Sequence, residues 1–319
     1  MTEAHDRATG CLLGLACGDA LGRPVEFTSA AAIDRQHGQV TEMLANGAHG
    51  QPAGTVTDDT ELALCIAESL AARERFDSED IAERFVGWLD SGPFDVGLMT
   101  HDAIRRLRDG ASPDEAGQQV WESRGEGSNA GNGSVMRCAP YAIALDDDPK
   151  KLIGVSRASS AITHADPRCT CGCAVLTLTL AGLLRQEAAP LSTALEHVGD
   201  VPDELLAALQ PVEAAVDRQV PLASVESELE SSGYVVDTLQ TALYDGLLAD
   251  TAEAAIVRAV NRGGDADTVG AVAGAVAGAR FGAGALPDRW VRSVREAERL
   301  RELAAELQSS RFGSGGVDA

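Results

Sequence analysis

Residues 57–67 read Thr57-Asp58-Asp59-Thr60-Glu61-Leu62-Ala63-Leu64-Cys65-Ile66-Ala67, an acidic cluster that leads directly into an apolar run. A second stretch has the same form: Asn261-Arg262-Gly263-Gly264-Asp265-Ala266-Asp267-Thr268, followed by Val269-Gly270-Ala271-Val272. Asp and Thr are preferred at helix N-termini, so each stretch predicts the start of a helix. A cap needs one side-chain oxygen, and each cluster supplies at least three, which indicates a further role.

If the two helix starts pack against each other, four carboxylates and two or more hydroxyls surround one point. Carboxylates that close repel one another, and a hard divalent cation removes the repulsion. All-oxygen ligands suit Mg²⁺ or Mn²⁺, and four carboxylates are enough to hold two such ions. The alternative is that each cluster is only a helix cap.

Composition and periodicity favour one all-α domain. The chain has 319 residues, of which 45% are hydrophobic and only 4% aromatic, and no linker of Pro, Gly and Ser divides it. Apolar residues recur with helical spacing along most of the sequence, and strand signals are scarce. We therefore expect a single-domain helical bundle over residues 1–308, with a Gly-rich tail at 309–319.

The net charge of −23 bears on partners. Only two of the 26 basic residues are lysines, and no basic cluster is present. Such a surface repels nucleic acid and anionic membranes, so neither is expected as a general partner. We interpret the charge as that of a halophilic protein, kept soluble where salt screens it. An acidic surface that attracts a cationic partner is the alternative.

The seven cysteines predict a reducing, cytoplasmic location, because their number is odd and most lie in apolar helical context. Cys169-Thr170-Cys171-Gly172-Cys173 lacks the spacing of a zinc knuckle and is interpreted as small core residues. No segment is read as a transmembrane helix. The nearest, residues 269–286, is built from Gly and Ala, contains Arg280, and predicts a buried helix.

A glycine-rich loop occupies residues 124–133 and is expected to enter a helix at Ser134. Glycines that lead into a helix N-terminus expose backbone N–H groups and can cradle a phosphate. An ordinary loop is the simpler interpretation of this segment.

Several motifs, taken together, resemble the ADP-ribosylglycohydrolase family. They are Gly10-Cys-Leu-Leu-Gly14-Leu-Ala-Cys-Gly18-Asp19-Ala-Leu-Gly22 with Glu26-Phe27, Thr57-Asp58-Asp59-Thr60, Gly131-Asn132-Gly133-Ser134-Val135-Met136-Arg137, Thr163-His164, Gly233-Tyr234-Val235, and the segment from Asn261 to Thr268. The matches run in order from about residue 8 to residue 285. The resemblance implies an all-α orthogonal bundle with a centre of two Mg²⁺ or Mn²⁺ ions. It also implies hydrolysis of the glycosidic bond between ADP-ribose and an acceptor on a protein or a small molecule. Carried over by position, the metal ligands are Thr57, Asp58, Asp59, Asp265, Asp267 and Thr268.

The same resemblance suggests roles for residues around the metals. Two candidates could take a proton from the attacking water or protonate the leaving group: Asp95, in a loop after Pro93, and Glu26. Asp95 could equally be a turn residue and Glu26 a surface acid. Asp19 could support the ligands or simply end a helix. The residues expected to bind ADP-ribose are Gly131, Asn132, Gly133, Ser134, His164 and Tyr234.

Two of these assignments carry alternatives. Where relatives often carry a second histidine two places after His164, this chain has Asp166, which puts a paired-histidine role in doubt. Tyr234 could stack on the adenine or ribose, or be a core or cap residue.

Other functions remain open at this point. A non-catalytic ADP-ribose-binding or structural member of the fold is the first alternative, and the filled ligand positions favour an enzyme over it. A two-metal phosphohydrolase is the second, and it would release AMP instead of ADP-ribose. The sequence does not choose between arginine, serine, a nucleic-acid end or a metabolite as the acceptor, between Mg²⁺ and Mn²⁺, or between oligomeric states.

Overall fold

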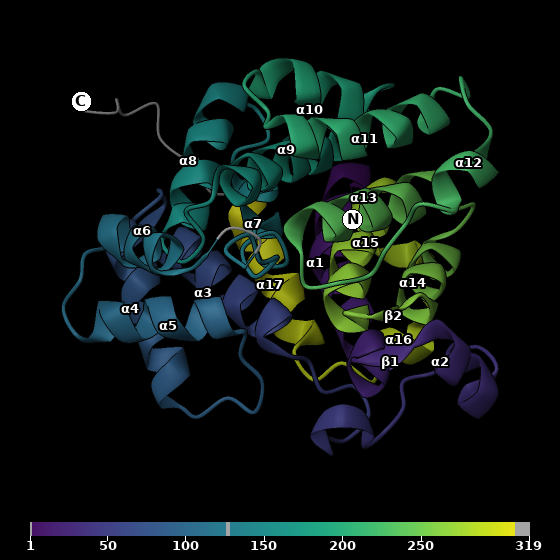
Figure 1. The fold of residues 1–319 in the computed structure, drawn as a ribbon, viewed down its shortest axis with the longest axis horizontal. Helices are drawn as coiled ribbons and strands as arrows, with labels where there is room; N and C mark the ends of the chain where they lie inside the picture. Colours follow the sequence, from purple (N-terminus) through teal and green to yellow (C-terminus); the bar gives the residue numbers. More distant parts are fainter. Residues whose placement is uncertain (1, 126–127, 310–319) are drawn as a thin grey trace.

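The computed structural model describes residues 2–125 and 128–309, and these residues form seventeen α-helices and a strand pair of four residues (Figure 1). The expected all-α fold is confirmed. The helices, in chain order, are α1 (Glu3–Gly22), α2 (Ala30–His37), α3 (Asp58–Arg73), α4 (Ser78–Asp90), α5 (Leu98–Arg108), α6 (Pro113–Ser123), α7 (Ala139–Ala144), α8 (Pro149–Ala161), α9 (Pro167–Leu184), α10 (Pro190–Val198), α11 (Asp203–Val216), α12 (Leu222–Glu226), α13 (Val235–Leu248), α14 (Ala252–Asn261), α15 (Ala266–Phe281), α16 (Asp288–Val291) and α17 (Ala297–Ser309). Three short 3₁₀ turns lie between these helices: η1 (Arg23–Val25), η2 (Gly47–His49) and η3 (Ala283–Ala285).

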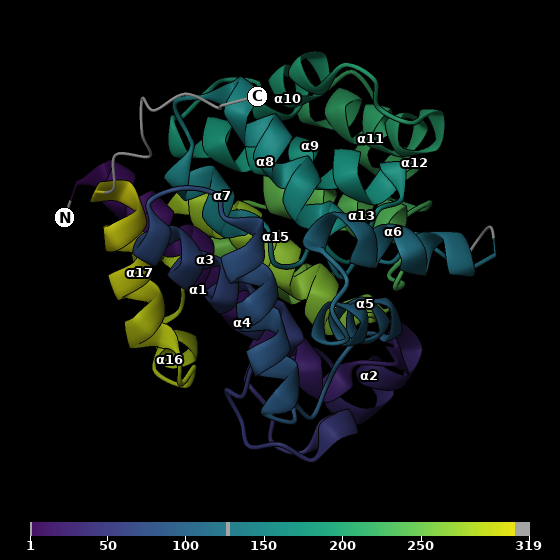
Figure 2. The same cartoon turned by 90° about the vertical axis from the view of Figure 1, so that its left-hand side faces the viewer.

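The antiparallel pair α1 and α15 lies at the centre of the bundle, side by side in both views (Figures 1 and 2). A row of small residues joins them, and we call it the glycine seam: Gly10, Gly14, Gly18 and Gly22 of α1 with Gly278, Gly274, Gly270 and Ala266 of α15. A methyl group added at Gly14 would lie 2.1 Å from the carbonyl oxygen of Gly274. The two backbones are therefore in direct contact, and only glycine fits along most of this line.

Other helices enclose this pair. Helices α13 and α14 pack on α15, and α17 packs on α1. Helices α8, α10 and α11 form an outer group around α9, while α4, α5 and α6 form a second group on another side (Figure 2). Every residue from Ala266 to Ala279 is buried, which explains why α15 has apolar side chains on all faces.

The strands β1 (Thr28–Ser29) and β2 (Gly263–Gly264) pair antiparallel, with Thr28 opposite Gly264. The N–H of Phe27 also donates to the carbonyl oxygen of Gly264, at 2.7 Å. This short ladder joins the end of η1 to the start of α15. It brings Glu26 and Asp265, 239 positions apart, to the same end of the central pair.

Two local expectations are wrong. Residues 133–137 form turns, and the next helix, α7, begins only at Ala139, with Pro140 in its first turn. Proline is favoured in the first turn because the N–H that it lacks has no helical partner there. At the other end of the chain, the spacing of Glu and Arg predicts one charged helix over residues 289–307, but the structure divides this segment between α16 and α17.

The tail expected at 309–319 lies outside the described residues, apart from Ser309, which ends α17. One described helix, α9, is long and apolar enough to cross a membrane by length and composition. Of the residues of α9, 83% are buried inside the bundle, as in the core helix of a globular domain. The three cysteines of the Cys169–Cys173 segment are buried in α9 as free thiols, as expected.

Candidate active site

The two acidic helix starts meet, as the sequence predicts. Thr57 caps α3, and Asp58 and Asp59 form its first turn. Asp265 precedes α15, and Asp267 and Thr268 lie in its first turn. The hydroxyl of Thr268 donates to Asp59 Oδ2 at 3.4 Å across 209 positions of sequence. We call Glu26, Asp58, Asp59, Asp265 and Asp267 the carboxylate cluster.

Asp19 supports this arrangement from the end of α1. Its carboxylate is fully buried and accepts four short contacts from the N-terminus of α3. The N–H and hydroxyl of Thr57 donate to Asp19 Oδ1, both at 3.0 Å. The N–H and hydroxyl of Thr60 donate to Oδ2, at 3.2 and 2.5 Å. Asp19 therefore fixes the direction of α3, and through it the positions of Asp58 and Asp59.

The cluster is electrostatically unfavourable when it is ionised. Burial, with the neighbouring Asp95 carboxylate as the next cause, raises the pKa of Asp58 to about 8. Burial first and Asp95 second also raise the pKa of Glu26 to about 8. Burial together with neighbouring carboxylates raises the pKa of Asp59 and of Asp267 well above the usual range. Four acids with this behaviour in one place call for a positive counter-charge.

Two buried oxygens in the cluster indicate the position of this positive counter-charge. Asp59 Oδ1 and Asp267 Oδ1 are both buried and have no hydrogen-bond partner among the described residues. An unsatisfied buried carboxylate oxygen is costly, and such groups are normally paired or coordinate a metal. Ligand atoms of Glu26, Asp265 and Asp267 lie within 4.8 Å of one another. The residues present therefore fit a hard divalent cation with oxygen ligands.

A cavity of about 470 Å³ opens above the cluster. Most of the residues singled out from the sequence line it: Glu26, Asp58, Asp59, Asp95, Gly131, Asn132, Gly133, His164, Asp265, Asp267 and Thr268. Thr57, Ser134 and Tyr234 are not among its lining residues. Thr57 lies beneath the cluster, and the Ser134 hydroxyl is buried behind the cavity wall, where it accepts from Ser160.

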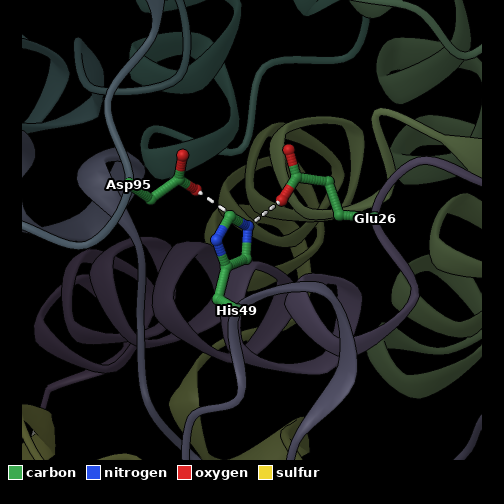
Figure 3. Close-up of side chains that lie close together, drawn as sticks. All are labelled: Glu26, His49 and Asp95. Carbon is green, nitrogen blue, oxygen red and sulfur yellow. Dashed lines mark hydrogen bonds and ion pairs between the residues drawn. The ribbon is translucent and has the colours of Figure 1, made fainter.

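Three side chains meet at one side of the cavity (Figure 3). His49 Nε2 lies 2.6 Å from Glu26 Oε2 and 3.5 Å from Asp95 Oδ2. Glu26 follows η1, His49 ends η2, and Asp95 lies in the loop between α4 and α5. Burial raises the pKa of Asp95 as well. The two acids that the sequence offers for proton transfer are thus linked through one imidazole.

The opposite wall is formed by the turn at residues 131–133. The side-chain amide of Asn132 donates to Asp265 Oδ2 at 2.7 Å and to Thr238 Oγ1 at 2.9 Å, which ties the turn to the carboxylate cluster. A methyl group at Gly133 would lie 2.8 Å from the His164 ring, so the turn passes directly over this histidine. Burial lowers the pKa of His164 to about 3, and the ring is therefore neutral at ordinary pH.

Arg137 and Arg168 brace this wall from behind. The buried Arg137 guanidinium donates to the Gly133 carbonyl and to the Thr163 hydroxyl, at 3.0 and 2.7 Å. Arg168 donates to the Tyr234 hydroxyl at 3.0 Å and forms two bonds to Asp166. Asp166, at the position of the missing second histidine, is thereby committed to Arg168 and to the Trp121 N–H.

Sequence reasoning missed two parts of the site. His49 is a single histidine in a glycine-containing loop, and nothing in its local pattern marks it. Residues 96–100 also line the cavity, and the Gly97 N–H donates to Asp58 Oδ2 at 3.2 Å. The contact between Gly97 and Asp58 could have been predicted from the sequence. Gly97 is the residue before α5, and the N–H groups at a helix start favour a carboxylate.

A larger cavity of about 810 Å³ lies away from the carboxylate cluster, beside α10 and α11. Two of its lining arginines are committed to backbone carbonyls: Arg7 bonds to Ala279 and Arg280, and Arg280 bonds to Gly246 and Ala249. The carboxylate cluster with its two unsatisfied oxygens lines the smaller cavity, and His49 contacts two of the acids in that lining, so the smaller cavity is the candidate active site.

Comparison with known proteins identifies the family. A sequence profile described as ADP-ribosylglycohydrolase matches residues 1–315. The chain belongs to the ADP-ribosylglycohydrolase family. It is 35% identical to an ADP-ribosyl-[dinitrogen reductase] glycohydrolase of Rhodospirillum rubrum, over 91% of this chain and 90% of the relative. It is also 35% identical to an ADP-ribosylarginine hydrolase, Tri1, of Pseudomonas putida (strain GB-1), over 96% of this chain and 78% of the relative.

A solved structure titled "ADP-ribosylglycohydrolase-related protein complex" superimposes with a TM-score of 0.78 at 35% sequence identity, and the match covers 97% of this chain and 99% of the other. These relatives confirm the expected fold and place this family member among the glycosidases.

Proposed function

We propose that this ADP-ribosylglycohydrolase uses two divalent cations, Mg²⁺ or Mn²⁺, to release ADP-ribose from an ADP-ribosylated arginine. One observation carries the proposal: the N-termini of α3 and α15 converge on a cavity and leave Asp59 Oδ1 and Asp267 Oδ1 buried without partners. The proposed ligands are Thr57, Asp58, Asp59, Asp265, Asp267 and Thr268. When bound, the cations would orient the ribose hydroxyls and lower the pKa of a water molecule.

The remaining chemistry is assigned to the chain itself. Glu26 and Asp95 are the proposed proton-transfer pair for the attacking water and the leaving group. The pKa of Glu26, raised to about 8, allows its carboxyl to hold a proton near neutral pH and pass it on, as general acid–base catalysis requires, and burial raises the pKa of Asp95 as well. An oxocarbenium-like transition state gains further from the negative charge around it.

The proposed pocket for the diphosphate and the nucleoside is the wall opposite Glu26. Gly131, Asn132, Gly133 and Ser134 were expected to bind phosphate at a helix start, but the segment is a turn. The donors proposed here are the backbone N–H groups of Gly131, Gly133 and Ser134, because that of Asn132 already donates to the Gly233 carbonyl. The neutral His164 ring supports the turn and lines the cavity. Tyr234 follows Gly233, a lining residue, and is proposed to stack on the adenine or ribose.

Charge and exposure support a cationic acceptor. The described residues that line the cavity include five aspartates and a glutamate but no lysine or arginine. Phe27 and Leu98, each 75% exposed, stand at its edge and offer apolar surface to the stem of an arginine side chain. The P. putida relative is named as an ADP-ribosylarginine hydrolase, in agreement with this choice.

The test is product analysis with matched substrates. The purified protein would be incubated with ADP-ribosyl-arginine and with ADP-ribosyl-serine peptides, with Mg²⁺ or Mn²⁺, in high and low salt. We expect free ADP-ribose from the arginine substrate and loss of turnover when the cations are chelated. Release of AMP would instead indicate a phosphohydrolase, and binding of ADP-ribose without turnover would indicate a non-catalytic member. The salt series tests the halophilic interpretation, which stays a prediction.

A further inference from the structure

His49 occupies a position that the site described so far leaves unexplained. Its Nε2 atom lies between two carboxylates that come from different parts of the chain, 2.6 Å from Glu26 Oε2 and 3.5 Å from Asp95 Oδ2 (Figure 3). All three side chains are at least four-fifths buried, so water screens these contacts poorly. One imidazole edge thus faces both residues of the proposed proton-transfer pair.

The loop that carries His49 is fixed from below by Arg23. This fully buried guanidinium donates to four backbone carbonyls of the loop at 2.9–3.2 Å, those of Leu44, Asn46, Pro52 and Thr55. The Asn46 N–H also bonds across the loop to the Gln51 carbonyl at 2.6 Å. A segment rich in glycine is therefore held in one conformation, and a buried arginine is committed to that purpose.

Two further contacts direct the ring. Gly47 has a φ of 69°, and a methyl group there would lie 2.3 Å from the Pro24 carbonyl oxygen, so the loop packs directly on the turn that ends at Glu26. The His49 ring also packs against Phe94, the residue before Asp95, with 5.4 Å between ring centres and a tilt of 56°. His49 is thus braced against the neighbours of both acids.

A glutamate needs such a constraint more than the other acids of the site. Glu26 has three rotatable side-chain bonds, and it precedes Phe27, which is 75% exposed and has a φ of 60°. Asp58, Asp59 and Asp267 are shorter and lie in the first turns of rigid helices. Without His49, the Glu26 carboxylate would keep only its contact with Asp267 and would gain the freedom to turn toward solvent.

We propose that His49 is a positioning residue that holds Glu26 beside Asp265 and Asp267 and keeps it within reach of Asp95. This inference rests on the proposed function, because it assigns His49 to the pair that handles the proton. It adds a residue that acts through Glu26 and Asp95 without touching the sugar. A partner that orients a functional group in this way typically contributes about 10–100-fold to activity.

The kinetic test compares three variants. His49→Phe keeps the ring contact with Phe94 but removes the nitrogen, and His49→Gln restores an amide N–H in a similar place. His197→Phe is the matched control, since His197 lies on α10 and bonds only to the Thr193 carbonyl among the described contacts. We expect His49→Phe to lower kcat by about 10–100-fold with little change in KM. His49→Gln should recover a large part of this loss, and the control should equal the wild type.

A crystal structure of His49→Phe gives a second readout that does not depend on turnover. The inference predicts that the Glu26 carboxylate leaves its place beside Asp265 and Asp267 while Asp58 and Asp59 stay where they are. An unchanged Glu26, or an active wild type whose kcat survives His49→Phe, would overturn the inference and leave the proposed function intact. If the wild type releases no ADP-ribose, the proposed function fails, and the position of Glu26 alone decides the role of His49.

Discussion

Two regions of opposite character lie along the central pair of helices, α1 and α15. Along most of their length the glycine seam brings backbone against backbone, with no side chain between them. The seam ends at the pair Gly22 and Ala266, and the carboxylate cluster lies at this end of the two helices. The first region is packed without charge, and the second collects like charges that packing cannot neutralise.

The seam explains how the cluster persists. Repelling acids would separate if their supports could move. The seam prevents this for α1 and α15, which have no space in which to shift, and Asp19 at the end of α1 holds the start of α3. Packing along the seam therefore stabilises the fold, while the like charges of the carboxylate cluster destabilise it. A stable scaffold commonly supports a destabilised functional site in this way. The predictions below separate the two regions by changing one while leaving the other intact.

The largest effect is expected from Asp267→Asn. The change keeps the shape of the side chain but removes a proposed metal ligand, so kcat/KM should fall about 10³-fold or more, equivalent to about 4 kcal/mol. Because the lost charge is buried among like charges, Tm in EDTA at pH 8 should not fall. Asp288→Asn, at an exposed position on α16, is the control and should change neither quantity. Unchanged turnover in Asp267→Asn would remove this residue from the site.

Gly14→Ala tests the seam. The added methyl would lie 2.1 Å from the Gly274 oxygen, so the helices must separate, at a cost of about 3 kcal/mol or a drop of at least about 5 °C in Tm. Gly154→Ala is the matched control on α8, where nothing lies within 4 Å of the new methyl. It should raise the stability slightly, by about 0.5–1 kcal/mol, because alanine favours a helix. Thermal melts that show equal behaviour in both variants would contradict the account of the seam.

The pH dependence of stability tests the cluster. In the folded, metal-free protein the pKa of Asp58 and of Glu26 is about 8, well above that of an exposed carboxyl, mainly because of burial. The folded state therefore holds more protons than the unfolded state between about pH 4 and pH 8, and stability falls as pH rises through that window.

Added Mn²⁺ should reverse this fall. At a concentration 100-fold above Kd it would contribute about 2.7 kcal/mol. The rise in Tm on adding Mn²⁺ should be larger at pH 8 than at pH 5, where protons compete for the carboxylates. A metal-free Tm that climbs from pH 5 to pH 8, or an equal Mn²⁺ effect at both, would count against the cluster as a cation site.

The smallest effect is expected at Tyr234. Removing the ring in Tyr234→Ala should weaken ADP-ribose binding by about tenfold, near the lower end of the 1–3 kcal/mol found for a base stacked on an aromatic side chain. Tyr234→Phe keeps the ring and loses only the hydroxyl contacts with Arg168 and Glu204, so its affinity should stay close to that of the wild type. Equal losses in both variants, measured by calorimetry, would indicate that the tyrosine serves Arg168 and not the ligand.

The features predictable from sequence are those set by local chemistry. The start of α3 follows from Thr57 and the acids behind it, and the helical period of residues 235–248 predicts the helix that α13 forms. The helix expected at Ser134 was wrong for a reason present in the sequence: Pro140 marks the first turn of α7. The glycines before it bend the chain over His164 instead.

Long-range partners were harder to predict. The meeting of Asp59 with Thr268 followed from chemical reasoning and from family resemblance, since neither cluster alone requires the other. The contact between His49 and Glu26 had no such signal, because it depends on Arg23 fixing a loop whose own sequence favours no single conformation. The pairing of small residues every four positions in α1 and α15 did carry a signal, and that spacing predicts a close helix crossing.

A crystal of the wild-type protein grown with Mn²⁺ and ADP-ribose tests the central claim most directly, through anomalous diffraction at the manganese edge. The account predicts two anomalous peaks between the starts of α3 and α15, with Asp59 Oδ1 and Asp267 Oδ1 among the coordinating atoms. Bound ADP-ribose in the cavity with no anomalous peak at the carboxylate cluster would contradict it.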